Sequence, residues 1–333
     1  MLQFLYLLLE GVSVIVPILL SVAFMTIIER KALASFQRRV GPNTVGYYGI
    51  LQPFSDALKL IVKETVVPAQ SNKILFYLAP VISIIVSLLG WAVVPFGQGL
   101  ALSDFSMGVI YSLTLSSFGI YGILFAGWSA NSKYAFLGGL RATAAMISYE
   151  LILSSAIIVV IMLAGSFNYT KIIEAQQAIW FIVPLAPIFI LFFISILAET
   201  SRTPFDLQEA ESELVAGFFT EHSSIIFVLF FLAEYSAIVL FSAITSILFL
   251  GGYNLPALPS EIFINETYIN LESIILGLKT CIFCLFFVWS RATFPRIRMD
   301  QIIVFCWTSL LPMVMAFIIF VPCLLFAFDW IVM

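Results

Sequence analysis

The sequence contains few charged residues, and this shortage excludes a water-soluble fold. Only 10% of the 333 residues are charged, whereas 62% are hydrophobic. Soluble domains contain about 25% charged residues, so a soluble chain of this length and composition could not cover its surface with polar groups. A hydrocarbon solvent removes that requirement, because apolar side chains then face outward. The composition therefore predicts a membrane protein.

Histidine, cysteine and nucleotide-binding motifs are also scarce or missing. The net charge of −4 argues against a nucleic-acid partner, which would require a basic face. With His222 as the single histidine, neither a metal site nor a Ser/His/Asp triad is predicted. No G-x-x-x-x-G-K or G-x-G-x-x-G motif is present. The four cysteines are expected to be small core residues and not a redox centre, because all lie in apolar stretches: Cys281, Cys284, Cys306 and Cys323.

Eight apolar stretches are expected to form transmembrane helices of one domain, residues 1–333. At 1.5 Å per residue, most are long enough to cross a hydrocarbon core of about 30 Å. The seventh is the shortest and contains Lys279, which makes it the weakest of the eight. The stretches are Phe4–Ile28, Ile74–Phe96, Phe105–Trp128, Ala142–Gly165, Ala178–Ala198, Ser223–Leu250, Ile274–Trp289 and Ile302–Phe328.

The basic residues are distributed very unevenly between the two sides of these spans. All except Lys171 and Lys279 fall in the odd-numbered loops. By the positive-inside rule, the odd loops face the cytoplasm or the matrix, and both termini face the other side. The N-terminus has no Arg- and Ser-rich transit peptide, so a chain found in an organelle is expected to be made there.

The first odd loop contains a segment with helical periodicity. From Leu51, apolar residues recur at intervals of three and four, whereas Asp56, Lys59 and Lys63 lie on the opposite face. Pro53 is tolerated in a first helical turn. The segment predicts a short amphipathic helix at the membrane interface. It is either a simple anchor or one wall of an entrance for a lipid-soluble ligand.

A second odd loop, Ala198–His222, contains one basic residue, Arg202, and many carboxylates interleaved with apolar residues. This pattern favours a loop folded back into protein over a solvated one. Packed carboxylates raise one another's pKa, so that some hold protons near neutral pH. The six are Glu199, Asp206, Glu209, Glu211, Glu213 and Glu221.

Two further carboxylates, Glu150 and Glu234, lie inside the fourth and sixth expected spans. An ionised residue at mid-bilayer costs roughly 2.5–3.5 kcal/mol on insertion scales, so both are expected to face the interior of the bundle. The neighbouring Tyr149 and Tyr235 could extend a hydrogen-bonded proton path. A structural polar contact between helices is the alternative.

These loops and spans contain strings that together resemble one family, subunit 1 of NADH:ubiquinone oxidoreductase, the membrane subunit of respiratory complex I nearest the quinone site. The strings follow one another in order over most of the chain. They include E-R-K-A-L-A-S-F-Q-R-R-V-G-P-N from Glu29, L-Q-P-F-S-D-A-L-K-L from Leu51, S-K-Y-A-F-L-G-G-L-R from Ser132, M-I-S-Y-E from Met146, A-E-T-S-R-T-P-F-D-L from Ala198, F-F-L-A-E-Y from Phe230 and R-A-T-F-P-R-I-R from Arg291.

The resemblance implies a quinone tunnel that opens between spans one and six and the amphipathic helix. It also implies an acidic path that couples quinone reduction to proton pumping in neighbouring subunits, with supporting basic residues. The implied tunnel residues are Arg30, Lys31, Arg38, Arg39, Asp56, Lys59, Phe218 and Phe219. The implied path comprises Glu150, Glu199, Asp206, Glu209, Glu211, Glu213, Glu221 and Glu234, and the supporting residues are Arg141, Arg202, Arg291, Arg296 and Arg298.

The family also implies where the electrons come from. NADH, FMN and iron–sulfur clusters would belong to partner subunits, ubiquinone would be the substrate, and this chain would hold no redox cofactor. The membrane would be the mitochondrial inner membrane, with a bacterial plasma membrane as the alternative. The sequence departs from the usual pattern where the family has Gln at Ala145, Asn at Ser201 and Phe219, and Tyr at His222 and Met299.

Two other classes stay open. The membrane subunit of an energy-converting hydrogenase has similar loops but need not bind quinone, and protection of Asp56 or Lys59 by a quinone-site inhibitor would separate the two. A stand-alone proton or cation transporter is expected to show internal repeats, and none is visible here.

Overall fold

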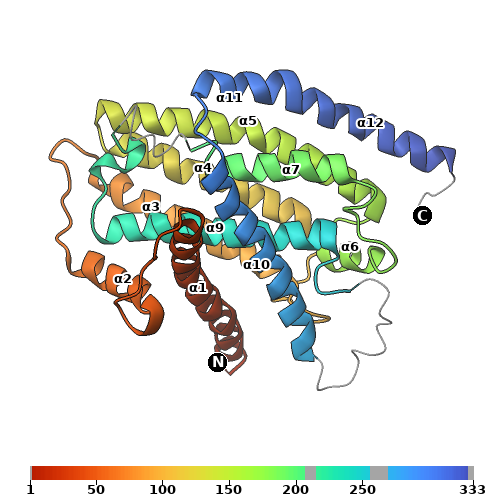
Figure 1. Ribbon diagram of the computed structural model, residues 1–333, viewed down its shortest axis with the longest axis horizontal. Coiled ribbons are helices and arrows are strands. Elements are labelled where there is room, and N and C mark those ends of the chain that lie inside the picture. The colour runs from red at the N-terminus through yellow and green to blue at the C-terminus, as the bar shows by residue number, and fades with distance from the viewer. Residues whose placement is uncertain (1, 207–214, 256–268, 329–333) are drawn as a thin grey trace.

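The computed structural model describes residues 2–206, 215–255 and 269–328. Within these ranges the chain forms helices and loops and no strand (Figure 1). The α-helices are α1 (Leu2–Phe36), α2 (Gln52–Val62), α3 (Lys73–Leu89), α4 (Gly108–Ser129), α5 (Lys133–Ala164), α6 (Tyr169–Ala175), α7 (Ala186–Glu199), α9 (Ile225–Leu250), α10 (Ile269–Thr293), α11 (Met299–Phe305) and α12 (Leu311–Ala327). Short 3-10 helices span Tyr47–Gly49, Gly90–Val93 and Gly217–Glu221, and a π-helical turn, Cys306–Leu310, joins α11 to α12.

The predicted all-α membrane fold with about eight spans is confirmed. Seven helical segments of the described chain are long and apolar enough to cross a membrane. They contain α1, α3, α4, α5, α9, α10 and the continuous run of α11 and α12. The shorter apolar helix α7 supplies the eighth hydrophobic element.

The lengths of several expected spans were wrong, two of them as follows. The stretch Ala178–Ala198 forms a helix only from Ala186, because Pro187 suits a first helical turn and residues 181–185 form a turn before it. Conversely, the seventh stretch is part of the 25-residue helix α10. Lys279 does not interrupt α10, since its ammonium donates to the carbonyls of Leu250, Gly252 and Asn254 at 2.7, 2.6 and 2.6 Å.

The predicted amphipathic helix is α2, with Pro53 in its first turn as expected. No residue of α2 is buried, and Leu58, Ile61 and Val62 are exposed. One of its links to the bundle is the edge-to-face contact of Phe54 with Phe24 of α1, with ring centres 6.2 Å apart. The apolar face of α2 is therefore free to lie on a bilayer surface.

The bundle is organised around α9, which packs against α1, α3 and α10 (Figure 1). Helix α3 also packs against α4, and α4 in turn packs against α5. Gly127 of α4 and Gly139 of α5 face each other so closely that a Cβ on Gly127 would lie 3.2 Å from the Cα of Gly139. Small residues allow two spanning helices to approach in this way.

The start of α5 explains where one charged residue lies. The span expected to begin at Ala142 begins at Lys133, because the hydroxyl of Ser132 accepts a hydrogen bond from the backbone N–H of Ala135 at 3.3 Å. Arg141 therefore lies within α5, where it is half-buried. At its other end α5 stops at Gly165, whose φ of 68° closes the helix in the left-handed conformation.

Candidate functional site

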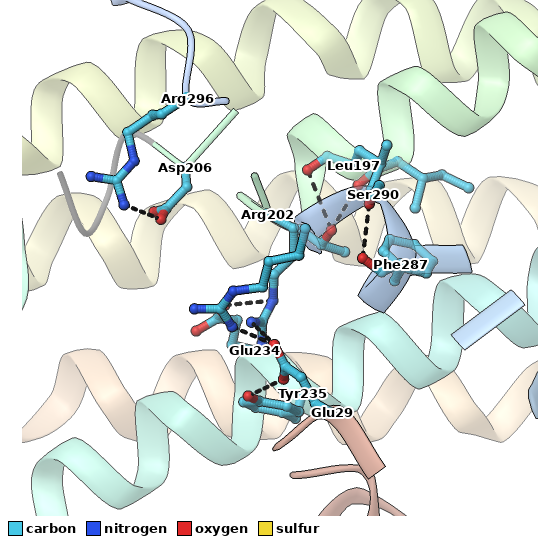
Figure 2. Close-up of polar contacts among 12 residues, drawn as sticks. Glu29, Leu197, Arg202, Asp206, Glu234, Tyr235, Phe287, Ser290 and Arg296 are labelled. Atoms are coloured by element: carbon cyan, nitrogen blue, oxygen red, sulfur yellow. Dashed lines mark hydrogen bonds and ion pairs between the residues drawn. The ribbon is translucent and has the colours of Figure 1, made fainter. Parts of the chain in front are cut away.

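A buried carboxylate, Glu29, lies at the centre of the most connected polar cluster of the described chain. Glu29 is on α1 and only 5% exposed. It accepts hydrogen bonds from Arg202 at 3.2 Å and from the hydroxyl of Tyr235 of α9 (Figure 2). It also accepts one from Arg291 of α10. Residues from two other helices and one loop therefore converge on this single carboxylate of α1.

Arg202 is placed by the turn that follows α7. Its backbone N–H donates to the carbonyl of Leu197 at 3.0 Å, and its own carbonyl accepts from Phe205 at 2.8 Å. The guanidinium is 7% exposed, and its Nε lies 3.2 Å from a carboxylate oxygen of Glu234. Its Cζ lies 4.5 Å from the centre of the Tyr235 ring, within the range of a cation–π interaction.

The loop after α10 is joined to the same turn. The backbone N–H of Ile297 donates to the carbonyl of Pro204 at 3.0 Å. One residue earlier, Arg296 forms an ion pair with the buried Asp206 at 2.7 Å (Figure 2). These contacts hold the loops after α7 and α10 together, which brings Arg202 and Arg291 to Glu29.

The charges in this cluster balance. Two carboxylates, Glu29 and Glu234, face two guanidinium groups, Arg202 and Arg291. Burial by itself would lower the pKa of Arg202, but the carboxylates of Glu234 and Glu29 outweigh it and hold that pKa above its ordinary value. Arg202 therefore stays charged, and its removal would take from Glu29 and Glu234 the cation that they share.

Two cavities meet at Glu234. The first, here called the arginine cavity, has a volume of about 240 Å³ and is lined by Glu29, Arg30, Leu33, Arg202, Phe231, Glu234, Tyr235 and Arg291. The second, here called the acid cavity, has a volume of about 140 Å³ and lies between α3, α4, α5, α7 and α9. Glu199 and Glu234 both line the acid cavity. Glu234 thus belongs to the wall of both cavities.

The residues expected at a tunnel mouth gather where α1 meets α2. Arg30 forms an ion pair with Asp56 at 2.7 Å, and Lys31 donates to the carbonyl of Tyr48. Lys59 is exposed on α2. Arg38 and Arg39 are exposed in the loop after α1. Because Arg30 also lines the arginine cavity, the mouth and that cavity are adjacent.

Phe218 and Phe219, predicted as tunnel residues, lie elsewhere. Both are buried beside Phe230 and line the acid cavity. Phe218 and Phe219 therefore do not lie with the other predicted tunnel residues, which are found where α1 meets α2. Arg298 is exposed at the start of α11.

The predicted acidic residues are brought together only in part. Glu199 is 5% exposed and lines the acid cavity with Glu234. Glu150 of α5 is half-buried and accepts a hydrogen bond from Ser117 of α4. Glu221 is half-buried at the end of a 3-10 helix. The remaining three predicted carboxylates lie outside the described residues: Glu209, Glu211 and Glu213.

Sequence reasoning overlooked Glu29 as a site residue. A signal was available, since Glu29 directly follows a long apolar stretch and precedes Arg30 and Lys31. A carboxylate at such a position has little water around it and needs a cationic partner from another helix. That partner could not be identified from the sequence.

The fold and this site together define a multi-pass membrane protein with a buried network of ion pairs next to internal cavities. The model of the NADH dehydrogenase family matches residues 9–322. The chain is 65% identical to NADH-ubiquinone oxidoreductase chain 1 of Mycosarcoma maydis, over 99% of both chains. It is 55% identical to the protein of that name from Podospora anserina, over 97% of this chain and 96% of the relative. It is 51% identical to an NADH-quinone oxidoreductase subunit of Rhodospirillum centenum, over 96% of this chain and 93% of the relative.

The chain therefore belongs to the NADH dehydrogenase family, the subunit 1 family of respiratory complex I. The resemblance drawn from the sequence strings is confirmed. The family model covers residues 9–322, so the matched region includes the residues around Glu29 as well as the spans.

Proposed function

We propose that this chain admits ubiquinone from the bilayer and couples its reduction to proton translocation within NADH:quinone oxidoreductase. The quinone enters where α1, α9 and α2 meet, beside Arg30, Asp56 and Lys59. Its headgroup is reduced beyond this chain by electrons that arrive from NADH through flavin and iron–sulfur clusters on partner subunits. The chain lies in the mitochondrial inner membrane with its odd-numbered loops toward the matrix.

One observation carries this proposal: Glu234 lines both the arginine cavity and the acid cavity. On one side, Arg30 connects the arginine cavity to Asp56 of the amphipathic helix. On the other side, Glu234 shares the acid cavity with Glu199. These contacts support a route from the proposed mouth, through the ion pairs of Arg202, to the carboxylates inside the bundle.

The ion pairs supply a physical means of coupling. A negative charge that develops near the arginine cavity during quinone reduction competes with Glu29 and Glu234 for the guanidinium of Arg202. Groups in a low-dielectric site interact strongly over short distances, so weaker pairing of Glu234 favours its protonation. The acid cavity has room for several water molecules, which can pass that proton to Glu199 and on toward Glu150 and the carboxylates of the Ala198–His222 loop.

The test is a pair of charge-removing variants in the intact complex. We expect Glu150→Gln and Glu213→Gln to lower both the rate of NADH:decylubiquinone reduction and the proton uptake, with normal assembly on a native gel. Glu174→Gln is the control, because Glu174 is exposed on α6 and outside the proposed path. Wild-type turnover and pumping in both path variants would overturn the proposed acidic path.

A further inference from the structure

A cavity apart from the arginine and acid cavities lies at the C-terminal end of α9. Its volume is about 450 Å³, and it is here called the polar cavity. Its walls come from the loop before α4, from α6 and from the segment after α9, and Figure 1 shows α6 beside that end of α9. Oxygen-bearing side chains line the cavity, among them Gln98, Asp104, Thr170, Glu174, Tyr253 and Asn254. No lysine or arginine that the structure describes lines it.

Two carboxylates of the polar cavity have no cationic partner among the described residues. Neither Asp104 nor Glu174 belongs to an ion pair there, and both are exposed. The hydroxyl of Thr170 donates to Asn168 at 2.7 Å and lies 3.4 Å from Asp104. Because Thr170 and Glu174 are four residues apart on α6, they share one face of that helix. The two carboxylates therefore border the same part of the cavity, and a cation between them would remove their mutual repulsion.

Tyr253 is a buried side chain of the same cavity whose hydroxyl has no partner. It lines the cavity and is only 4% exposed, yet it forms no hydrogen bond with any residue that the structure describes. Burial, and after it three carboxylates, raise the pKa of Tyr253 from 10.0 to about 12, so the phenol stays neutral. The three are Glu272, Glu174 and Asp104. Buried hydroxyls are normally satisfied by protein, water or an ion, so the unpaired hydroxyl at this wall points to an occupant of the cavity.

The oxygen atoms of the polar cavity suit a hard divalent cation that keeps part of its water shell. Ca²⁺ and Mg²⁺ bind carboxylate and amide oxygens, and Mg²⁺ keeps several waters where one or two carboxylates hold it. No group of three Asp, Glu, His or Cys within the described ranges could enclose a bare metal ion. A volume of about 450 Å³ has room for an ion together with its waters, at about 30 Å³ for each water.

We propose that the polar cavity binds one partly hydrated divalent cation, Ca²⁺ or Mg²⁺, between Asp104, Glu174 and Tyr253. The ion neutralises the two carboxylates and joins the loop before α4 to α6 and to the segment after α9. Because both carboxylates are exposed, the dissociation constant is on the order of 10⁻⁴–10⁻³ M, the range of weak calcium sites. The polar cavity shares no lining residue with the arginine or acid cavity. The ion therefore stabilises this end of the bundle and takes no part in the proposed quinone reaction.

The test is amide hydrogen exchange of the intact complex, followed by mass spectrometry in peptides that cover α6 and the loop before α4. CaCl₂ or MgCl₂ at ten times the dissociation constant should slow this exchange about tenfold, because the ion binds only the closed state of these segments. The reference is EDTA with KCl at equal ionic strength. Asp104→Asn should lose most of the cation-dependent protection. Asp300→Asn is the matched control, because Asp300 is an exposed carboxylate on α11 that lines none of the three cavities.

A second variant keeps the test decisive if Asp104→Asn does not assemble. Tyr253→Phe removes one oxygen and keeps the ring, so the cation-dependent protection should fall severalfold. Equal protection by CaCl₂ in the wild type and in the assembled variants would overturn the site. Peptides that are already protected in EDTA, with no response to either salt, would show that another group fills the cavity, such as a basic side chain of a neighbouring subunit, and the proposal would be wrong.

Discussion

The guanidinium of Arg202 lies 3.2 Å from the carboxylate of Glu29, although the two residues are 173 positions apart in the chain. Both side chains are almost completely buried. Arg202 also pairs with Glu234, and Glu29 also pairs with Arg291. These ion pairs join the end of the first span to the loop after α7.

Arg202→Met should destabilise the protein severely. It leaves the buried Glu29 and the half-buried Glu234 without the cation they share, and loss of one partner of a buried pair costs about 3–5 kcal/mol. We expect little assembled complex on a native gel and faster thermal inactivation of what remains. Arg30→Met is the matched control for stability, because the Arg30–Asp56 pair is 49% and 37% exposed and such pairs contribute about 1 kcal/mol or less. Equal stability of the two variants would show that the buried network is not needed for folding.

Tyr235→Phe should have a smaller effect. It removes the hydroxyl that donates to Glu29 and keeps the ring that lies against Arg202. An unsatisfied buried hydrogen-bonding group costs about 1–3 kcal/mol, so the melting temperature should fall while the complex still assembles. Tyr121→Phe serves as the control, since Tyr121 is 52% exposed. A melting temperature equal to that of Tyr121→Phe would contradict the prediction.

Lys279→Met should destabilise the packing at the C-terminal end of α9, around Leu250. The buried ammonium donates to three carbonyls around the end of that helix, and its Nζ lies 5.1 Å from the centre of the Trp180 ring. Loss of these charge-assisted contacts should cost at least about 3 kcal/mol, measured as reduced thermal stability. Lys171→Met on the exposed face of α6 should change little. Lys279→Arg should recover only part of the stability, because a planar guanidinium cannot point at three carbonyls as an ammonium does.

His222 should make the protein sensitive to mild acid. Burial lowers the pKa of His222 from 6.5 to about 4, and its ring stacks on Phe76 with centres 4.3 Å apart. Above pH 6.5 the folded and unfolded states are both neutral at this position, so its contribution to stability is constant. As the pH falls from 6.5 toward 4, the unfolded state binds a proton that the folded state does not, and about 3 kcal/mol is lost. The measurement compares the melting temperatures of wild type and His222→Phe between pH 6.5 and pH 4, and the two should diverge as the pH falls. Parallel curves would show that the pKa of His222 is not lowered by burial.

The transmembrane architecture could be read from the sequence because hydropathy is a local property. Seven of the eight expected spans form helices of membrane length, and the amphipathic helix α2 begins beside Pro53 as its periodicity predicts. One error concerns a position where a side chain finds a partner elsewhere. Lys279 suggested a weak seventh span, yet the carbonyls at the end of α9 satisfy its charge and α10 continues past it.

The site was only partly predictable for the same reason. The sequence indicated that Glu234 and Arg202 were exceptional, because charged residues in or beside apolar spans require partners. It did not indicate that Glu29 was their common partner, nor that Phe218 and Phe219 line the acid cavity and lie away from the group at α1 and α2. Those facts depend on which helices pack together.

The sequence by itself determined that this protein crosses a membrane several times and belongs to the complex I subunit family, because composition and ordered strings of residues carry that information along the chain. The tertiary structure alone decided which charges pair. Arg202, Glu29 and Arg291 come from distant segments, and an ion pair depends on the distance between atoms and on the exclusion of water. Both are set only when the helices pack.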